Sequence, residues 1–427
     1  MHKNIVVCCD GTGNEISENI SNVLKLYRTL RKTGKTEPEQ RVFYDPGVGT
    51  LARPNPWTKF KQDAFTVFGL ATGYGLDDNV LSAYRFLIDN YDDGDDIYLF
   101  GFSRGAYTVR VLAALIHKIG LLSQQQNNLA DEALAAYKQT PLSVEIATFD
   151  ALQSGKSRTE ADQSFSADDG AAQFARIVSP RWPTIRFMGV WDTVASVIVP
   201  GAGLIPGFRL EELAFTLRNP SVRLFRQALA IDERRRMFRP LRWSDSQTFM
   251  HNRFSDSPKN LEPQDAKQVW FAGVHADIGG GYPERESGIS KYPLIWMIEE
   301  AVAHGLGVDR RTVNHLGWGV ARKGSPYTYV EPDFKAQLHN SCTKAWPLLE
   351  PIPKSDKYKE WLKRESWLGY YIPNKEPRAI PENAVIHESV IKRMGAGMGY
   401  EPINVPEKYA VEPWETGSKE VRENAGA

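Results

Sequence analysis

The chain has 427 residues, and the 42% that are hydrophobic are enough to form one or more large cores. Lys and Arg together number 52, as do Asp and Glu, so no overall field of one sign favours nucleic acid or an acidic substrate as a partner. No stretch approaches the ~18 apolar residues of a membrane-spanning helix.

Five short apolar runs, each followed by polar residues or glycine, predict parallel β-strands. They are residues 5–9, 42–44, 97–102, 185–191 and 269–274. Helical patterns lie at residues 23–31, 76–91, 106–122, 210–237 and 293–306. Because strands alternate with helices, the sequence predicts an α/β fold with a doubly wound, mostly parallel sheet of the α/β-hydrolase kind. In such sheets the active site lies at the carboxyl ends of the strands.

The domain organisation follows from changes in composition along the chain. Residues 1–310 carry the strand and helix patterns and are predicted to form the catalytic domain. Within them, residues 123–181 are rich in Gln, Ala and Ser and predict a helical insertion, either a cap or a mobile loop, with helices near 131–139 and 168–177. Residues 311–427 are rich in Pro, Trp and Tyr and predict an extension packed on the core, with its last dozen residues disordered.

The most informative segment is Ile-Tyr-Leu-Phe-Gly-Phe-Ser-Arg-Gly-Ala at residues 97–106. It places Ser103 at a sharp turn between a predicted strand and a predicted helix, which is the nucleophile elbow of α/β-hydrolases. The glycines at 101 and 105 let strand and helix approach without a Cβ clash. The serine hydroxyl then lies at the start of a helix, whose dipole favours a developing oxyanion.

A serine nucleophile needs a base and an orienting carboxylate, in chain order Ser, Asp or Glu, His. Asp192 directly follows the predicted strand at 185–191, and His275 follows the one at 269–274. We therefore assign Ser103, Asp192 and His275 as the candidate triad. Asp277 is an alternative orienting group and His387 an alternative base.

The oxyanion hole requires the backbone N–H of the residue after the nucleophile, here Arg104, and a second N–H from another loop. The segment Asp-Gly-Thr-Gly-Asn at residues 10–14 follows the first strand, and its Gly11 and Thr12 are the predicted source. Asp10 is expected to hydrogen-bond that loop.

Two further stretches bear on the substrate. Residues 194–208 are apolar, contain Gly and Pro, and begin two residues after Asp192. They predict either an acyl-chain groove or lipid-facing loop, with Val197, Ile198, Leu204 and Ile205 as substrate-binding residues, or a buried connection. The arginines at 234, 235, 236, 239 and 242 either hold a phosphate or have a structural role in pairs with carboxylates.

The cellular location is predicted from the cysteines and from the start of the chain. Cys8, Cys9 and Cys342 make no disulfide framework and fit a reducing compartment. The first residues lack the apolar segment and cleavage site of a signal peptide. We expect a cytoplasmic protein, or one secreted by a route that reads no N-terminal signal.

Six ordered blocks resemble the uncharacterised α/β-hydrolase domain family that includes type VI secretion phospholipase effectors. The blocks lie between residue 4 and about residue 306, at residues 10–14, 44–50, 101–106, 191–193, 231–235 and 271–282, and the tail is similar as well. The resemblance implies that the family's serine, aspartate and histidine correspond to Ser103, Asp192 and His275.

The resemblance also implies hydrolysis of carboxylic esters, with phospholipase A activity as in the effector members. The expected substrate is a lipid or a small ester, and no metal or cofactor is required. The resemblance further implies a partner in the secretion apparatus or an immunity protein. Contact with a membrane surface is expected from the apolar stretch at 194–208, and the balanced charge predicts no nucleic acid partner. The alternatives are a small-molecule esterase with no lipid role and a non-catalytic interaction module that keeps the fold.

Overall fold

The computed structural model describes residues 2–11, 19–33, 37–47, 75–153, 170–194, 198–205, 208–210, 213–255, 257–343 and 350–414. Within these ranges the central element is an eight-stranded sheet of order β14-β13-β10-β7-β4-β3-β1-β2, in which every neighbouring pair is parallel. Its strands are β1 (Lys3–Cys9), β2 (Glu39–Asp45), β3 (Asp96–Phe102), β4 (Ile185–Trp191), β7 (Val222–Ala230), β10 (Asp265–Phe271), β13 (Ala384–His387) and β14 (Tyr409–Glu412).

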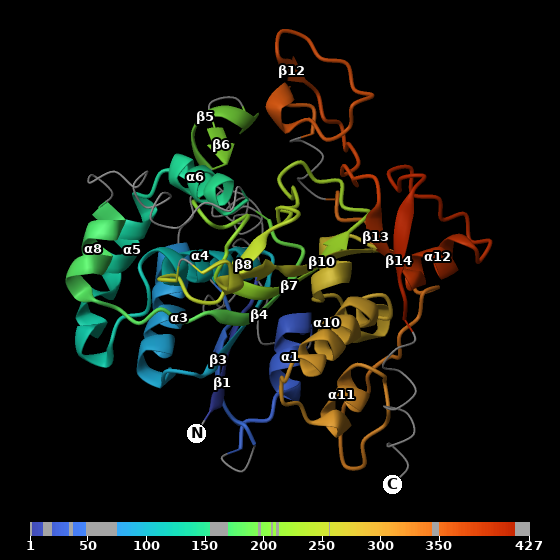
Figure 1. Ribbon diagram of the computed structural model, residues 1–427. Helices are drawn as coiled ribbons and strands as arrows, with labels where there is room; N and C mark the ends of the chain where they lie inside the picture. The colour runs from blue at the N-terminus through green and yellow to red at the C-terminus, as the bar shows by residue number, and fades with distance from the viewer. Residues whose placement is uncertain are drawn as a thin grey trace, which may run out of the picture.

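Helices cover both faces of this sheet (Figure 1). One face carries α3 (Leu76–Asn90) and α4 (Arg104–Lys118), and the other carries α1 (Asn22–Thr29) and α10 (Lys291–Ala303). Successive side chains of a strand point to opposite faces, so a strand between two helical layers must be apolar throughout. In β1, Ile5, Val7 and Cys9 pack under α3 and α4, whereas Val6 and Cys8 pack on the other side. The predicted α/β class with a doubly wound sheet is confirmed.

The described part of residues 123–181 is largely helical. It contains η1 (Gln124–Leu129), α5 (Ala130–Lys138), α6 (Leu142–Gln153) and α8 (Gly170–Val178). Ala133, Leu134 and Tyr137 of α5 join the core that α3 and α4 form over the sheet. The insertion is therefore packed against the face that carries the elbow helix α4.

The predicted helix at residues 210–237 is wrong, because this segment contains the central strand β7. Strand β7 pairs with β4 on one side and with β10 on the other. Arg226 and Gln227 interrupt its apolar pattern, yet both are buried. Arg226 binds Asp265 and Glu300, and the Gln227 amide donates to the Leu241 carbonyl, so tertiary partners satisfy polar groups inside a strand.

The segment beyond residue 310 contributes to the same sheet. Strand β13 pairs with β10, β14 pairs with β13, and α12 (Glu388–Met394) packs beside them. Ile386 and Val390 share a small core with Trp270. The predicted disorder of the last dozen residues falls outside the described part of the chain.

The remaining elements are short. They are β5 (Ile198–Ile205) with β6 (Phe208–Leu210), β8 (Thr248–Met250) with β9 (Leu261–Pro263), β11 (Lys354–Ser355) with β12 (Tyr370–Tyr371), α9 (His275–Gly279), α11 (Arg310–Leu316), and the turns η2 (Pro258–Asn260), η3 (Glu284–Glu286) and η5 (Asp356–Tyr358). Strand β1 begins near the N-terminus at the bottom of Figure 1, and β5, β6 and β12 lie at the top. Strands β5, β6 and β12 therefore lie beyond the carboxyl ends of the parallel strands. Among the described residues, no helix is both long and apolar enough to cross a membrane.

Candidate active site

Ser103 lies between β3 and α4 in a backbone conformation that L-residues rarely adopt. Its φ is 56° and its ψ is −120°, and its N–H donates to the Trp191 carbonyl of the neighbouring strand. A non-glycine residue in this region stores strain, and such strain is concentrated at functional sites. The serine is 7% exposed. The sharp strand-to-helix turn predicted from the sequence is therefore present, with Ser103 at its apex.

The two glycines that flank Ser103 are required by close approaches of backbone. A Cβ at Gly101 would lie 2.6 Å from the backbone of Ala106, and a Cβ at Gly105 would lie 2.1 Å from the Cys9 carbonyl oxygen. Neither distance leaves room for a side-chain carbon, so any larger residue would push α4 away from the sheet. These contacts explain the Gly-x-Ser-x-Gly pattern in physical terms.

His275 begins α9, four residues after β10 ends, and its ring contacts Ser103 and Asp192. Nε2 lies 2.8 Å from the Ser103 Oγ, and Nδ1 lies 2.6 Å from the Asp192 Oδ2. Since an ionised carboxylate only accepts hydrogen bonds, Nδ1 carries the proton and Nε2 is left to accept from the serine hydroxyl. The rings of Phe102 and Phe238 flank the imidazole, with centroids 4.7 and 4.9 Å away. Burial lowers the pKa of His275, and the bond to Asp192 offsets this only in part.

Asp192 directly follows β4, as predicted, and it is fully buried. Its Oδ1 accepts from the Ala230 N–H at 3.0 Å, and both of its oxygens accept from the Arg378 guanidinium. Burial by itself raises the pKa of this carboxyl, but the Arg378 charge and the His275 hydrogen bond outweigh it. The pKa of Asp192 therefore lies well below its usual range.

Glu233 is a second buried carboxylate beside the histidine, and the sequence did not single it out. It accepts from the His275 N–H at 3.1 Å, from the Arg235 side chain at 2.8 and 2.9 Å, and from the Ser341 hydroxyl at 2.8 Å. Burial raises the pKa of Glu233, but the Arg235 charge and hydrogen bonds outweigh it and bring the pKa to about 2. Glu233 therefore fixes the backbone of the histidine and stays ionised at neutral pH.

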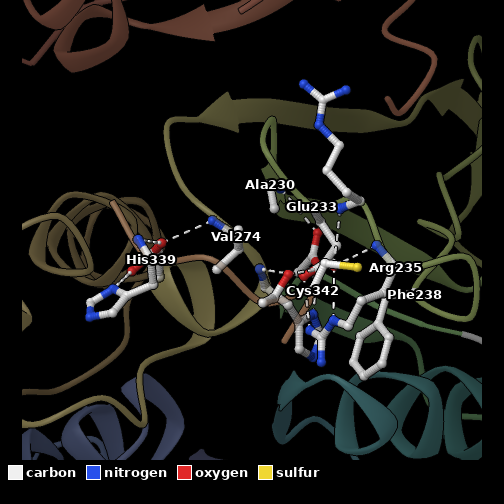
Figure 2. A network of polar contacts seen from close by, with 12 residues as sticks. Ala230, Glu233, Arg235, Phe238, Val274, His339 and Cys342 are labelled. Atoms are coloured by element: carbon white, nitrogen blue, oxygen red, sulfur yellow. Dashed lines mark hydrogen bonds and ion pairs between the residues drawn. The ribbon is translucent and has the colours of Figure 1, made fainter. Parts of the chain in front are cut away.

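A second contact holds the loop that carries the histidine. Asp277 accepts from the Val274 N–H at 3.0 Å and lies 2.6 Å from the His339 Nδ1. Figure 2 shows His339 on one side of Val274, and Glu233 and Arg235 on the other. Asp277, the alternative orienting group, thus binds His339, whereas Asp192 binds His275.

The alternative base lies elsewhere. His387 ends β13, its Nδ1 lies 2.8 Å from the Ser389 Oγ, and its ring stacks on Phe271. Burial lowers the pKa of His387 to about 3. His387 is thus a buried structural residue that caps α12, and its ring accepts from the Ser389 N–H.

Part of the predicted oxyanion loop is described. Asp10 accepts from the Gly11 N–H at 2.7 Å, from the Tyr44 hydroxyl at 2.9 Å and from the Ser21 hydroxyl, as expected for a carboxylate that orders its own loop. The first turn of α4, which begins at Arg104, packs directly on this loop through Gly105. Thr12 lies outside the described residues.

The predicted substrate segment is described only in its backbone. Val197 lies outside the described residues, and Ile198, Leu204 and Ile205 belong to β5, where the backbone alone is described. Strand β5 packs against β11 and pairs with β6.

Three arginines of the cluster are engaged within the protein. Arg235 pairs with Glu233 and lies over the Phe238 ring, and Arg239 pairs with Glu360 and Glu376. Arg236 donates to the backbone carbonyls of residues 352 and 353, and Arg242 is exposed. These contacts favour the structural interpretation of the cluster over a phosphate site.

Two site residues were missed by the sequence reasoning, Arg378 and Glu233. Glu233 stands inside the Ile-Asp-Glu-Arg-Arg block at 231–235, which gave a signal only through the family resemblance. Arg378 lies 186 positions from Asp192 in an irregular segment, and no local pattern indicates such a contact.

The catalytic-domain model of the type VI secretion system Tle1-like phospholipase effectors matches residues 3–300. The uncharacterized protein YEL023C of Saccharomyces cerevisiae is 30% identical over 248 residues, which are 56% of this chain and 32% of the yeast protein. A crystal structure of an uncharacterized protein from Pseudomonas aeruginosa aligns over 72% of this chain and 46% of that chain, with 17% identity and a TM-score of 0.34. This chain thus spans less than half the length of either relative.

Proposed function

This chain belongs to the family of Tle1-like phospholipase effectors of the type VI secretion system, and from that premise we propose that it is a serine hydrolase of carboxylic esters. The observation that carries the proposal is the line of two hydrogen bonds from the Ser103 Oγ through His275 to Asp192. Nucleophile, base and orienting carboxylate in this order form a catalytic triad.

In the proposed mechanism the Ser103 Oγ attacks an acyl carbonyl while His275 Nε2 takes the hydroxyl proton. Asp192 keeps the imidazole in the required tautomer and stabilises the imidazolium that forms. The Arg104 N–H stabilises the oxyanion, and we propose Thr12 as the second donor because the Gly11 N–H already donates to the Asp10 carboxylate. The imidazolium then returns its proton to the leaving alcohol, and a water activated by His275 hydrolyses the acyl-enzyme.

Ser103 is tested with a fluorophosphonate probe, which phosphonylates an activated serine with loss of fluoride. We expect the wild type to be labelled and Ser103→Ala to be unlabelled. Ser389→Ala is the matched control, because Ser389 also lies 2.8 Å from a histidine nitrogen but belongs to a pair outside the proposed site. An unlabelled wild type would favour a non-catalytic interaction module that keeps the fold.

For the substrate we propose a phospholipid, cleaved as by a phospholipase A. The support is the family, the apolar segment 194–208 that follows Asp192, and three exposed apolar side chains next to β12. Leu362, Trp367 and Leu368 are 78–86% exposed, and the β11–β12 pair packs on β5 through β11. Large apolar side chains exposed in one segment are typical of a contact surface and fit a membrane or micelle.

The lipid contact is tested by Ile198→Asp on micellar phospholipid and on short p-nitrophenyl esters. We expect a loss on phospholipid with short soluble esters nearly unchanged, because their transition state needs only the triad and the oxyanion hole. Ile177→Asp, at an exposed position of α8, is the matched control and should change neither activity. Turnover of short esters without phospholipid activity would indicate a small-molecule esterase.

The family also leads us to propose delivery by the secretion apparatus without a signal peptide, and an immunity protein as a partner. Expression directed to the periplasm of a bacterial host should then be toxic, and Ser103→Ala should abolish the toxicity. Toxicity that survives the Ser103→Ala change would contradict a hydrolytic effector role.

A further inference from the structure

Arg378 reaches into the site from the segment between β12 and β13 and binds both carboxylate oxygens of Asp192. Its NH1 donates to Oδ1 at 2.6 Å and its NH2 donates to Oδ2 at 2.9 Å. The same two nitrogens also donate to the carbonyls of Ala230 and Phe238, at 3.0 and 2.6 Å. Arg378 is 1% exposed. This two-point contact is the planar fork geometry that arginine, and not lysine, provides.

The backbone around Arg378 is fixed independently of Asp192. Asn404 donates to the Arg378 carbonyl and to the Ile231 carbonyl, both at 3.1 Å. Strand β13, which follows Arg378, is hydrogen-bonded into the main sheet through β10. The guanidinium is thus held in place by the fold and is not a mobile surface side chain.

Four charged groups are linked to His275, either directly or through the carboxylate that binds it, and their formal charges cancel. Asp192 and Glu233 are the two carboxylates, and Arg378 and Arg235 are the two guanidinium groups. Asp192 comes from the end of β4, Glu233 and Arg235 from the segment after β7, and Arg378 from the C-terminal part of the chain. Ser103, at the start of α4, is the uncharged fifth neighbour.

We propose that Arg378 is a positioning residue of the triad, which holds both oxygens of Asp192 and balances its charge so that His275 remains a neutral base. The proposal rests on the hydrolase function proposed above. Arg378 acts through Asp192, and no role in contacting the substrate is assigned to it.

Physical chemistry gives the consequence of removing this charge. Without Arg378 the site would carry one excess negative charge, in a place where burial makes electrostatic interactions strong. An excess negative charge favours the imidazolium over the neutral imidazole, so the pKa of His275 would rise. A protonated His275 cannot accept the serine proton, and the nucleophile would be inactive until the pH exceeded the raised pKa. The effect of the change should therefore depend on pH.

The experiment measures the rate of fluorophosphonate labelling of Ser103 between pH 5 and 9, in Arg378→Gln and in Arg378→Lys. The acid limb is the part of the curve of labelling rate against pH in which the rate falls as the pH is lowered. For Arg378→Gln we expect this limb to move to higher pH by about one unit or more, the size of pKa shift that a neighbouring charge produces. Labelling lost at pH 6 should then be recovered in large part at pH 9. For Arg378→Lys the charge remains, so the acid limb should stay near the wild-type position. Its rate should fall by about tenfold at every pH, because one ammonium group cannot hold both oxygens.

Arg226→Gln is the matched control. Arg226 lies on β7, is also buried, and binds Asp265 through NH1 and NH2 at 2.9 and 3.0 Å. It makes the same kind of fork with a carboxylate that does not bind His275. We expect this variant to change stability and to leave the pH profile of labelling in place.

The outcomes separate this proposal from the proposed function. A wild type that is not labelled contradicts the hydrolase itself. A labelled wild type, together with an Arg378→Gln variant that is folded and has an unmoved acid limb, overturns the role of Arg378. Should Arg378→Gln not fold, as circular dichroism would show, Arg378→Lys decides: an acid limb in the wild-type position with a lowered rate supports the proposal, and a wild-type rate or a shifted limb overturns it.

Discussion

Gly105→Ala is the change whose effect follows most directly from the geometry of the elbow. A Cβ at this position would lie 2.1 Å from the Cys9 carbonyl oxygen, 2.5 Å from the Asp10 carbonyl oxygen and 2.5 Å from the Cys9 carbonyl carbon. Ordinary contacts of a Cβ begin at 3.4 Å, and all three neighbours are backbone atoms that cannot rotate away. To admit the methyl group, α4 and the end of β1 must separate by about 1.3 Å.

The magnitude follows from the rigidity of these partners. Overpacking a close-packed site costs about 1–3 kcal/mol, and we expect the upper end of this range here because β1 is held by β2 and β3 on either side. The same separation would displace Asp10 and Gly11, which lead into Thr12, the proposed second oxyanion donor. Labelling of Ser103 should therefore fall even under conditions in which the variant is folded.

The assay is urea denaturation followed by circular dichroism, with the free energy of unfolding taken by linear extrapolation. Gly395→Ala is the control, since Gly395 has a helical φ of −75° and the nearest atom to its Cβ is 3.5 Å away. It should be neutral or stabilising by about 0.4–1 kcal/mol, because alanine reduces the entropy of the unfolded chain. If Gly105→Ala unfolds at the same urea concentration as the wild type, with the same slope, the close approach does not determine the residue at 105.

Three further predictions concern the charged and nucleophilic groups. Loss of Ser103 and loss of His275 should reduce kcat by similar factors, of order 10³ or more, since triad members act as a unit; a much smaller effect of His275→Ala would contradict its role as base. In the wild type the acid limb of labelling should lie below pH 6.5, because burial lowers the pKa of His275 and the neutral base persists above that pKa; a limb above pH 7 would contradict this. The Glu233 carboxyl has a pKa of about 2 in the folded protein against an ordinary value of 4.5, so its contribution to stability is complete above pH 4.5 and is lost as the pH falls toward 2. Glu233→Gln should therefore lower the slope of unfolding free energy against pH in that interval by up to about 1.4 kcal/mol per pH unit, measured by urea titrations, and an unchanged slope would count against the ionised buried carboxylate.

Three of the predicted strands are buried on both faces. The apolar runs at 5–9, 97–102 and 185–191 became β1, β3 and β4, because burial on both faces leaves continuous hydrophobic residues. Strand β7 was missed, since its Arg226 and Gln227 find partners only in the folded protein and the Leu, Ala and Gln residues around them fit a helix as well. Strands β13 and β14 are four residues long, too short for a periodic pattern to indicate them.

The proposed triad could be found from the sequence because each member follows a strand, or nearly so, in an order that the fold prescribes. Ser103 and Asp192 come directly after β3 and β4, and His275 follows β10 by four residues. Glu233 and Arg378 carry no such signal. Whether a glutamate is buried against a histidine N–H depends on how two loops meet, and hydrophobic periodicity contains no information on that contact.

Arg378 is one of three residues beyond position 300 that contact groups holding His275 or its loop, although the family model matches only residues 3–300. A buried carboxylate without a compensating charge is costly, so an Asp192 that lacked Arg378 would destabilise the folded chain. Ser341 and His339 add contacts to Glu233 and Asp277, the carboxylates that hold the histidine loop. All three contacts come from outside residues 3–300, yet each ends on a group within hydrogen-bonding distance of His275 or of the loop before it. The catalytic geometry proposed for residues 3–300 therefore depends on the segment that follows them, and we expect the chain cut after residue 310 to lose labelling of Ser103 even if its sheet still forms.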